Sequence, residues 1–186
     1  MAHEDHKKQA DDAIGCVVVT ASDTRDESTD ESGRTIQALL RGAGHRIEGY
    51  RILKDEPADI AAFVKAQFGA PGIQAVIVNG GTGVSQRDST FEAIDALLEK
   101  RLPGFGEIFR HLSYLEIGSS AMLSRATCGV AQGCAVFSIP GSVSAVKLAM
   151  TKLILPELAH LVWVAKPAAG QGARHGHHAK KAEHKH

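Results

Sequence analysis

The sequence predicts a three-layer α/β fold in which helices cover both faces of a mainly parallel sheet. Short β-branched runs at residues 14–20, 73–78 and 134–139 are apolar almost throughout. This pattern is typical of strands that are buried on both faces of a sheet. Stretches with helical periodicity separate these runs, and strands that alternate with crossover helices form parallel sheets. With 186 residues the chain is long enough for one such domain, which we expect over residues 13–165.

Between the first two runs, the sequence predicts a helix, a strand and another helix. Ile36, Leu39 and Leu40 mark the first helix, which ends near two glycines. Residues 45–53 alternate weakly and predict an additional strand. Pro57 begins the next helix, whose apolar side chains recur at i, i+3, i+4 and i+8: Ile60, Phe63, Val64 and Phe68.

After the strand at 73–78, three more helices are expected. Ser89 and Glu92 fit a capping box, followed by the apolar stripe Phe91, Ile94, Leu97 and Leu98. Residues 104–115 carry a second stripe: Phe105, Ile108, Phe109 and Leu112. The long helix after residue 142 turns six apolar side chains inward: Val146, Met150, Leu153, Ile154, Leu158 and Leu161. Pro156 is expected to kink this helix rather than end it.

Composition and charge favour a cytoplasmic protein that binds neither nucleic acid nor a membrane. The formal net charge is zero, so nothing overall attracts a polyanion. No apolar run approaches the ~20 residues of a membrane helix, and no signal-peptide pattern begins the chain. Cys16, Cys128 and Cys134 form an odd set without a C-x-x-C pair, as expected of reduced thiols packed in or near strands.

Both ends of the chain are expected to lie outside the fold. Residues 1–12 are almost entirely polar and predict a flexible segment. Residues 166–186 are rich in small, basic and His residues that cannot form a core, and predict a disordered tail. The histidine spacing gives no closed tetrahedral metal site, and no chemistry is assigned to the tail.

Three loops rich in Gly, Ser, Thr or Asp leave the carboxyl ends of predicted strands, at residues 20–23, 79–89 and 140–142. In parallel sheets, ligands bind where such loops gather. The sequence therefore predicts a binding site at their meeting point.

The loop after the strand at 73–78 concentrates glycine, at Gly80, Gly81 and Gly83, around Thr82. It has neither the Gly-Lys-Ser/Thr ending of a P-loop nor the spacing of a dinucleotide fingerprint. Glycine lets backbone N–H groups approach an anion closely, whereas the alternative is a tight turn that requires positive φ. Three glycines at a strand end favour a ligand-binding loop.

Acidic residues near two helix starts leave two interpretations open. Asp88 either stabilises the dipole of the next helix or coordinates a divalent metal beside Arg87, whose guanidinium suits phosphate. For Asp55, dipole stabilisation is favoured on sequence alone. If both carboxylates share the sheet edge, they suit magnesium-assisted phosphoryl or nucleotidyl transfer. Gly141 and Ser142 present the same choice between phosphate binding and simple helix capping.

Several segments occur in the order typical of one family: Asn79–Gly83 with Arg87–Thr90, Pro103–Arg110, Ala121–Ala126 and Ile139–Ser142 with Ala145–Val146. Together they resemble the MoaB/Mog family of molybdenum-cofactor biosynthesis proteins, and residues 116–125 are most similar to the MoaB branch. The resemblance covers roughly residues 13–165. It implies a three-layer α/β domain that binds molybdopterin. Active members transfer AMP from Mg-ATP to the terminal phosphate of molybdopterin and release pyrophosphate.

The resemblance also implies roles for individual residues. Asp55 and Asp88 would be catalytic and would act through Mg²⁺. The molybdopterin side would be formed by Gly80, Gly81, Thr82, Gly83, Arg87 and Ser124. The ATP side would be formed by Ser22, Asp23, Gly141 and Ser142.

Further implications concern partners and activity. Family members form homotrimers, the MoaB branch also forms homohexamers, and the product passes to a molybdate-insertion protein. Many relatives have Pro where this chain has Phe91, a difference expected to alter packing more than chemistry. A non-catalytic molybdopterin carrier of the same fold remains the alternative to the enzyme.

Overall fold

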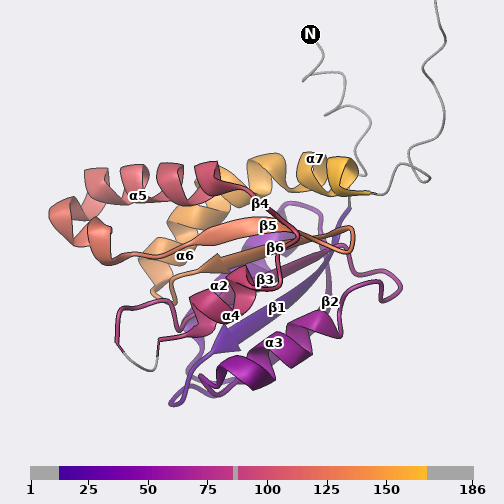
Figure 1. Ribbon diagram of the computed structural model, residues 1–186, viewed down its shortest axis with the longest axis horizontal. Coiled ribbons are helices and arrows are strands. Elements are labelled where there is room, and N and C mark those ends of the chain that lie inside the picture. The colour runs from indigo at the N-terminus through magenta and orange to yellow at the C-terminus, as the bar shows by residue number, and fades with distance from the viewer. Residues whose placement is uncertain (1–12, 86–87, 167–186) are drawn as a thin grey trace, which may run out of the picture.

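The computed structural model describes residues 13–85 and 88–166 (Figure 1). The expected flexible segment at 1–12 and the tail from 167 to 186 lie outside the described residues. Lys166 follows directly on the last helix.

One six-stranded sheet forms the centre of the domain, in the order β2-β1-β3-β6-β5-β4. Its strands are β1 (Gly15–Ala21), β2 (Arg46–Leu53), β3 (Ala75–Asn79), β4 (Lys100–Arg101), β5 (Thr127–Ala131) and β6 (Cys134–Ile139). The pairs β1–β2, β1–β3 and β3–β6 are parallel, while β5–β6 and β4–β5 are antiparallel. The prediction of a mainly parallel sheet is confirmed, and so are the four strands and the five helical segments that the sequence indicated.

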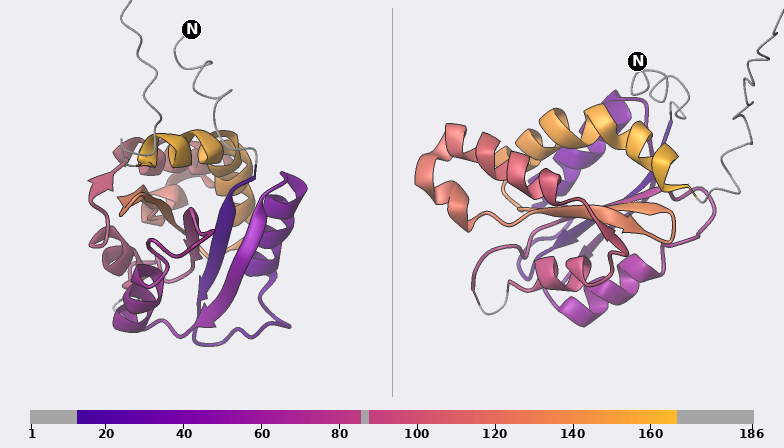
Figure 2. Two further views of the ribbon diagram at one scale, coloured as in Figure 1. Left: turned by 90° about the vertical axis from the view of Figure 1, so that its right-hand side faces the viewer. Right: turned by 45° about the horizontal axis from the view of Figure 1, so that its top comes forward.

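Helices cover both faces of the sheet, as predicted (Figures 1 and 2). They are α2 (Glu31–Gly42), α3 (Pro57–Lys65), α4 (Thr90–Asp95), α5 (Pro103–Ile117), η1 (Gly118–Leu123), α6 (Val143–Ala149), η2 (Met150–Ile154) and α7 (Leu155–Ala165). One face packs against α2, α5, α6, η2 and α7. The other packs against α3 and α4. The fold is therefore a three-layer α/β sandwich.

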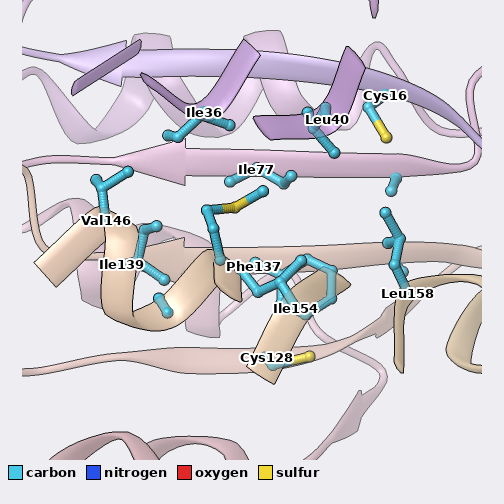
Figure 3. Close-up of a cluster of buried hydrophobic side chains, with 14 of the residues drawn as sticks. Cys16, Ile36, Leu40, Ile77, Cys128, Phe137, Ile139, Val146, Ile154 and Leu158 are labelled. Atoms are coloured by element: carbon cyan, nitrogen blue, oxygen red, sulfur yellow. The ribbon is translucent and has the colours of Figure 1, made fainter. Parts of the chain in front are cut away.

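Alternate side chains of each central strand fill two separate cores. In β1, Val18 belongs to the larger core and Val17 and Val19 to the smaller one. Figure 3 shows the larger core, where Ile77 and Phe137 of the sheet meet Ile36 of α2 and Ile154 of η2. Burial on both faces explains why these strands are continuously apolar in sequence.

The three cysteines are unpaired and buried in strands, which confirms that prediction for Cys16, Cys128 and Cys134. Burial disfavours the thiolate and raises the pKa of Cys16 and of Cys134 to about 12, and raises the pKa of Cys128 further. These thiols are inert packing groups rather than nucleophiles.

The antiparallel edge of the sheet was not predicted. β5 and β6 form a hairpin whose two turn residues, Gln132 and Gly133, both have positive φ, at 49° and 77°. Two successive residues of positive φ form the tight turn that suits the twist of a hairpin. Asn-Gly is the usual sequence of such turns, so Gln-Gly gave a weak signal.

The capping box expected before α4 forms only in part. Ser89 occupies the N-cap position, but within the described residues its side chain makes no capping hydrogen bond. The carboxylate of Glu92 instead pairs with the guanidinium of Arg125, 33 residues away. Two helices are also shorter than their stripes suggested, because α3 ends before Phe68 and α4 before Leu97. Both side chains still pack against the smaller core.

The long helix continues past Pro156, as predicted, and its irregularity takes the form of the π turn η2 just before the proline. The sequence predicted no membrane-length apolar segment, whereas the helix Val143–Ala165 is, by length and composition, long and apolar enough to cross a membrane, with a mean hydropathy of 1.4 in its most apolar window. One third of its most apolar window is buried inside the domain. Met150, Ile154 and Leu158 pack on the sheet, so a place in the core accounts for part of this apolar character.

Candidate functional site

A cavity of about 390 Å³ opens where β1, β3 and β6 end. Fourteen residues line it: Ala21, Ser22, Thr24, Arg25, Gly80, Gly81, Thr82, Gly83, Asp88, Leu123, Ser124, Pro140, Gly141 and Ser142. Most of them come from the three loops that the sequence singled out, joined by Thr24 and Arg25 just beyond the first loop and by the end of η1. Parallel strands bring these loops together, because their carboxyl ends share one edge of the sheet.

The glycine loop passes very close to neighbouring backbone. Gly80 has φ 100°, and a β-carbon placed on it would lie 2.2 Å from the carbonyl oxygen of Ala21. A β-carbon on Gly141 would lie 3.0 Å from the Cα of Gly80. Glycine is therefore required for two of the three loops to meet, and their backbones form the floor of the cavity.

Asp88 lines the cavity as an ionised carboxylate. Its Oδ2 accepts hydrogen bonds from the hydroxyl of Ser85 at 2.5 Å and from the amide of Ser85 at 3.0 Å. The hydroxyl bond lowers the pKa of Asp88; burial opposes this, and the nearby Arg125 charge assists it. The carboxylate is thus held in its charged form beside glycines suited to anions.

Asp55 lies against the same loop but behind it. Its Oδ1 accepts a 2.7 Å hydrogen bond from the hydroxyl of Thr90 at the start of α4. A β-carbon on Gly81 would lie 2.4 Å from this oxygen, and Gly81 has φ 58°. Asp55 is not among the described residues that line the cavity, whereas Gly81 is. The two predicted carboxylates therefore flank one glycine loop, Asp55 against Gly81 and Asp88 against Gly83.

The loop after β1 forms the opposite wall. The hydroxyl oxygen of Ser22 accepts from the amides of Thr24 and Arg25, at 3.3 and 3.2 Å. Asp23 lies between two lining residues, and its Oδ1 accepts a 3.3 Å hydrogen bond from the amide of Asp55. This contact links the predicted nucleotide side to the predicted catalytic carboxylate.

The third wall is the start of the long helix. Ser142 is the N-cap of α6, and its hydroxyl oxygen accepts from the amide of Ala145 at 3.3 Å. Helix N-termini present free N–H groups and a positive dipole end, which attract anions. Ser142 therefore caps α6 and also lines the cavity, and phosphate binding at this position stays a prediction.

Sequence reasoning missed Arg25, which lines the cavity. Its Nη2 donates to the carbonyl oxygen of Gly141 at 3.0 Å, and its Nη1 donates to the hydroxyl of Ser32 at 2.5 Å. Nη1 also lies 3.5 Å from Oδ1 of Asp30, a carboxylate with no exposed surface. Arg25 thus ties the first loop to the third and leaves a positive charge in the wall.

A buried polar network supports this arginine from below. The Ser32 hydroxyl lies 2.9 Å from Oδ1 of Asp30 and 2.9 Å from Oδ1 of Asn79. The amide of Asn79 donates to the carbonyl of Val19 and to the hydroxyl of Thr20. Asp30 is the N-cap of α2, Ser32 lies in its first turn and Asn79 ends β3, so no sequence spacing could have revealed the contact.

Two further predicted site residues are Ser124 and Arg87, and only the first lies within the described residues. Ser124 lines the cavity beside Leu123, and its place on the pterin side stays a prediction. Arg87 lies outside the described residues. Within residues 13–85 and 88–166, no three His, Cys, Asp or Glu side chains form a group that could hold a metal alone. A metal here would need ligands from a bound molecule in addition to the carboxylates.

Comparisons with known proteins show which family this chain is similar to. A family model described as "Probable molybdopterin binding domain" matches residues 16–160. Molybdenum cofactor biosynthesis protein B of Bacillus subtilis is 55% identical over 163 residues, which cover 87% of this chain and 96% of the relative.

Solved structures show the same similarity. A crystal structure of a molybdenum cofactor biosynthesis protein B has a TM-score of 0.80 and 51% identity, and the alignment covers 82% of this chain and 96% of that one. The tungsten cofactor synthesizing protein MoaB from Pyrococcus furiosus has a TM-score of 0.75 and 35% identity, with 84% and 99% covered.

Proposed function

This chain belongs to the molybdopterin-binding-domain family of molybdenum cofactor biosynthesis proteins, and on that premise we propose that it is a molybdopterin adenylyltransferase. It takes part in molybdenum cofactor biosynthesis. In the proposed reaction, an oxygen of the terminal phosphate of molybdopterin attacks the α-phosphorus of ATP. The bond from that phosphorus to the bridging oxygen breaks, and pyrophosphate leaves.

The observation that supports the proposal is that two elements suited to anions line one cavity. The glycine loop with Ser124 forms one side, and Ser22 with the N-terminus of α6 forms the other. Two phosphorylated substrates held on facing walls would have their reacting groups next to each other, which supplies much of the catalysis in phosphoryl transfer. Arg25 adds a positive charge to the ATP side.

The carboxylates fit magnesium as the bound metal. Mg²⁺ in nucleotide sites takes one or two carboxylates and completes its shell with water and substrate phosphates. Asp55 and Asp88, which flank one glycine loop, would hold it, and its chemistry would be to neutralise charge on the phosphates. The chain's own groups would orient the substrates.

The test is to assay purified protein with ATP, magnesium and molybdopterin and to measure adenylylated product. Asp88→Asn should nearly abolish transfer and leave molybdopterin binding largely intact, because it removes charge but little volume. Asp59→Asn, at an exposed carboxylate in the first turn of α3, is the matched control and should retain activity. Wild-type protein that forms no product with magnesium present would overturn the proposal.

A non-catalytic molybdopterin carrier is the second candidate function. It is favoured by the position of Asp55, which lies behind Gly81 and accepts a hydrogen bond from Thr90. A carrier would bind molybdopterin with the same affinity whether ATP is present or absent. Calorimetric titration discriminates, because tight Mg-ATP binding that is lost in Asp55→Asn would contradict the carrier.

We further propose that the chain assembles as a homotrimer or homohexamer in the cytoplasm and delivers its product to a molybdate-insertion protein. Large apolar side chains are exposed where α5 and η1 extend beyond the sheet (Figure 1): Tyr114, Leu115, Ile117, Met122 and Leu123. An exposed apolar patch of this kind supports self-association. Light scattering that gives the 19.7 kDa monomer mass would contradict the assembly.

A further inference from the structure

The guanidinium of Arg125 binds the outside of the glycine loop. Its Nε donates to the carbonyl oxygen of Thr82 at 3.0 Å, and its Nη2 donates to those of Gly83 at 2.5 Å and Asp88 at 2.6 Å. Its Nη1 pairs with the carboxylate of Glu92 on α4. One side chain therefore joins both ends of the segment from Thr82 to Asp88 to the helix that follows.

The carbonyl oxygens of Thr82, Gly83 and Asp88 accept hydrogen bonds from a guanidinium that lies outside the cavity. Thr82, Gly83 and Asp88 line the cavity, whereas Arg125 is not among its described lining residues. Carbonyl oxygens carry partial negative charge and would repel a phosphate if they faced it. Because a guanidinium has five N–H donors in a rigid fork, Arg125 can hold all three away from a bound anion at once.

Phe91 covers the face of this guanidinium. Its ring centroid lies 5.1 Å from Cζ of Arg125, within the range of a cation–π contact. Phe91 directly follows Thr90, whose amide donates to the carbonyl of Gly81 and whose hydroxyl donates to Asp55. The aromatic contact thus lies beside the hydrogen bonds that fix the second carboxylate.

We propose that Arg125, held in place by Phe91, is a positioning residue that sets the glycine loop and Asp88 for substrate. Arg125 does not touch substrate. It acts through the carbonyls of Thr82, Gly83 and Asp88, and Phe91 acts through Arg125. This inference rests on the proposed function for its kinetic consequence, but its structural consequence can be measured without any reaction.

The structural test is hydrogen–deuterium exchange resolved to single amides. The amide of Ser85 donates to Oδ2 of Asp88, and the amide of Asp88 donates to the carbonyl oxygen of Ser85. The amide of Thr90 donates to the carbonyl oxygen of Gly81. Arg125→Lys keeps the charge but loses the fork, and Phe91→Leu keeps apolar volume but loses the ring. Both variants should exchange these three amides about tenfold faster or more, with Arg125→Lys showing the larger effect.

Matched controls separate loop positioning from general loosening. Arg101→Lys breaks a comparable arginine fork, whose Nε donates to Oδ2 of Asp95 at 2.8 Å and whose Nη2 donates to the Asp95 carbonyl. Phe63→Leu shortens a partly buried ring on α3 that packs against the smaller core. Neither control should change exchange at Ser85, Asp88 or Thr90.

The kinetic test separates positioning from binding. Displaced catalytic groups lower kcat, so Arg125→Lys should lower kcat about 10- to 100-fold and Phe91→Leu about threefold to tenfold. The KM for ATP should change less than twofold in both. The variants should also require more magnesium for half-maximal rate, since the change reaches Asp88.

The outcomes are distinguishable. Unchanged exchange of the three amides in both Arg125→Lys and Phe91→Leu would overturn the inference, whatever the activity. Faster exchange with no transfer by wild-type protein would retain the positioning role and remove the proposed function. If Arg125→Lys fails to fold, Phe91→Leu alone decides, and normal exchange with normal kcat in that variant contradicts the proposal.

Discussion

The hydroxyl of Tyr50 donates a 2.6 Å hydrogen bond to Oδ2 of Asp30, a carboxylate with no exposed surface. Thr20 donates to the same oxygen at 2.5 Å. The edge strand β2, the central strand β1 and the N-cap of α2 therefore meet at one buried anion. Since Oδ1 of Asp30 faces Arg25, this anion also supports the wall of the cavity.

Loss of the Asp30 carboxylate should be costly. Asp30→Ala removes the cap of Gly33 and the acceptor of three hydroxyls, and should lower the free energy of unfolding by about 3 kcal/mol or more. Tyr50→Phe removes one donor and should cost about 1 kcal/mol. Urea unfolding measures both. Asp59→Ala is the control at an exposed first-turn carboxylate, and an equal cost there would contradict the special role of Asp30.

Asp30 should also make stability depend on pH. Burial opposes its charge, but hydrogen bonds from Thr20, Tyr50, Gly33 and Ser32 together hold its pKa below the ordinary value. A lowered folded-state pKa stabilises the fold above the unfolded value of about 3.9, and this stabilisation is lost as pH falls through the folded pKa.

Asp30→Asn cannot titrate, so its free energy of unfolding should fall less steeply than that of wild type between about pH 5 and pH 2. Some slope should remain, because hydrogen bonds from Ser28 and Thr29 lower the pKa of Asp26 to about 2. Urea unfolding at a series of pH values gives the two slopes. If the free energy of unfolding falls equally steeply with pH in wild type and in Asp30→Asn, the charge of Asp30 contributes nothing to stability.

Two glycine-to-alanine changes should affect different properties: one should lower the transfer activity, and the other should raise the stability of the fold. A β-carbon on Gly83 would lie 2.5 Å from Oδ2 of Asp88, so Gly83→Ala should displace this carboxylate and lower the proposed transfer about tenfold or more. A β-carbon on Gly104 meets no described atom within 4 Å, so Gly104→Ala should stabilise α5 by about 0.5–1 kcal/mol. Thermal unfolding and the transfer assay test the pair, and full activity in Gly83→Ala would argue against a role for Asp88.

A substitution in the turn between β5 and β6 should stabilise the fold. Gln132 has φ 49°, a conformation that Asn adopts more readily than Gln. Gln132→Asn should therefore raise the free energy of unfolding by about 0.5 kcal/mol, measured by urea unfolding. Gln132→Val, with a β-branched side chain at positive φ, is the opposing variant and should lower it.

The parts of the fold that could be predicted are those where local pattern and burial coincide. The runs in β1, β3 and β6 are covered on both faces, so their apolar continuity reflects the structure directly. β5 could not be predicted in this way, because it is short, contains Gly129 and depends on a turn with an unusual sequence. Element boundaries at α3 and α4 depended on packing beyond the helix ends.

In the candidate site, too, residues with a local sequence signal could be predicted, whereas residues that depend on distant partners could not. The glycine loop and Ser142 could be found because glycines and small polar residues after strands have a local meaning. Arg25 and Arg125 could not, since their partners lie up to 116 residues away and a long side chain can reach many positions. The position of Asp55 behind Gly81 likewise depends on Thr90 from another element.

The π turn η2 explains how one long helix keeps its apolar side on the sheet. Val146, Met150, Ile154, Leu158 and Val162 are fully buried at a strict spacing of four residues. In a regular α-helix, residues four apart are rotated by about 40°, so this stripe would wind away from the sheet. The wider turn at Met150–Ile154 rotates the later residues back. It acts as a one-residue insertion in the helical repeat, so a helix that begins at the cavity keeps its apolar side on the sheet through its C-terminal half.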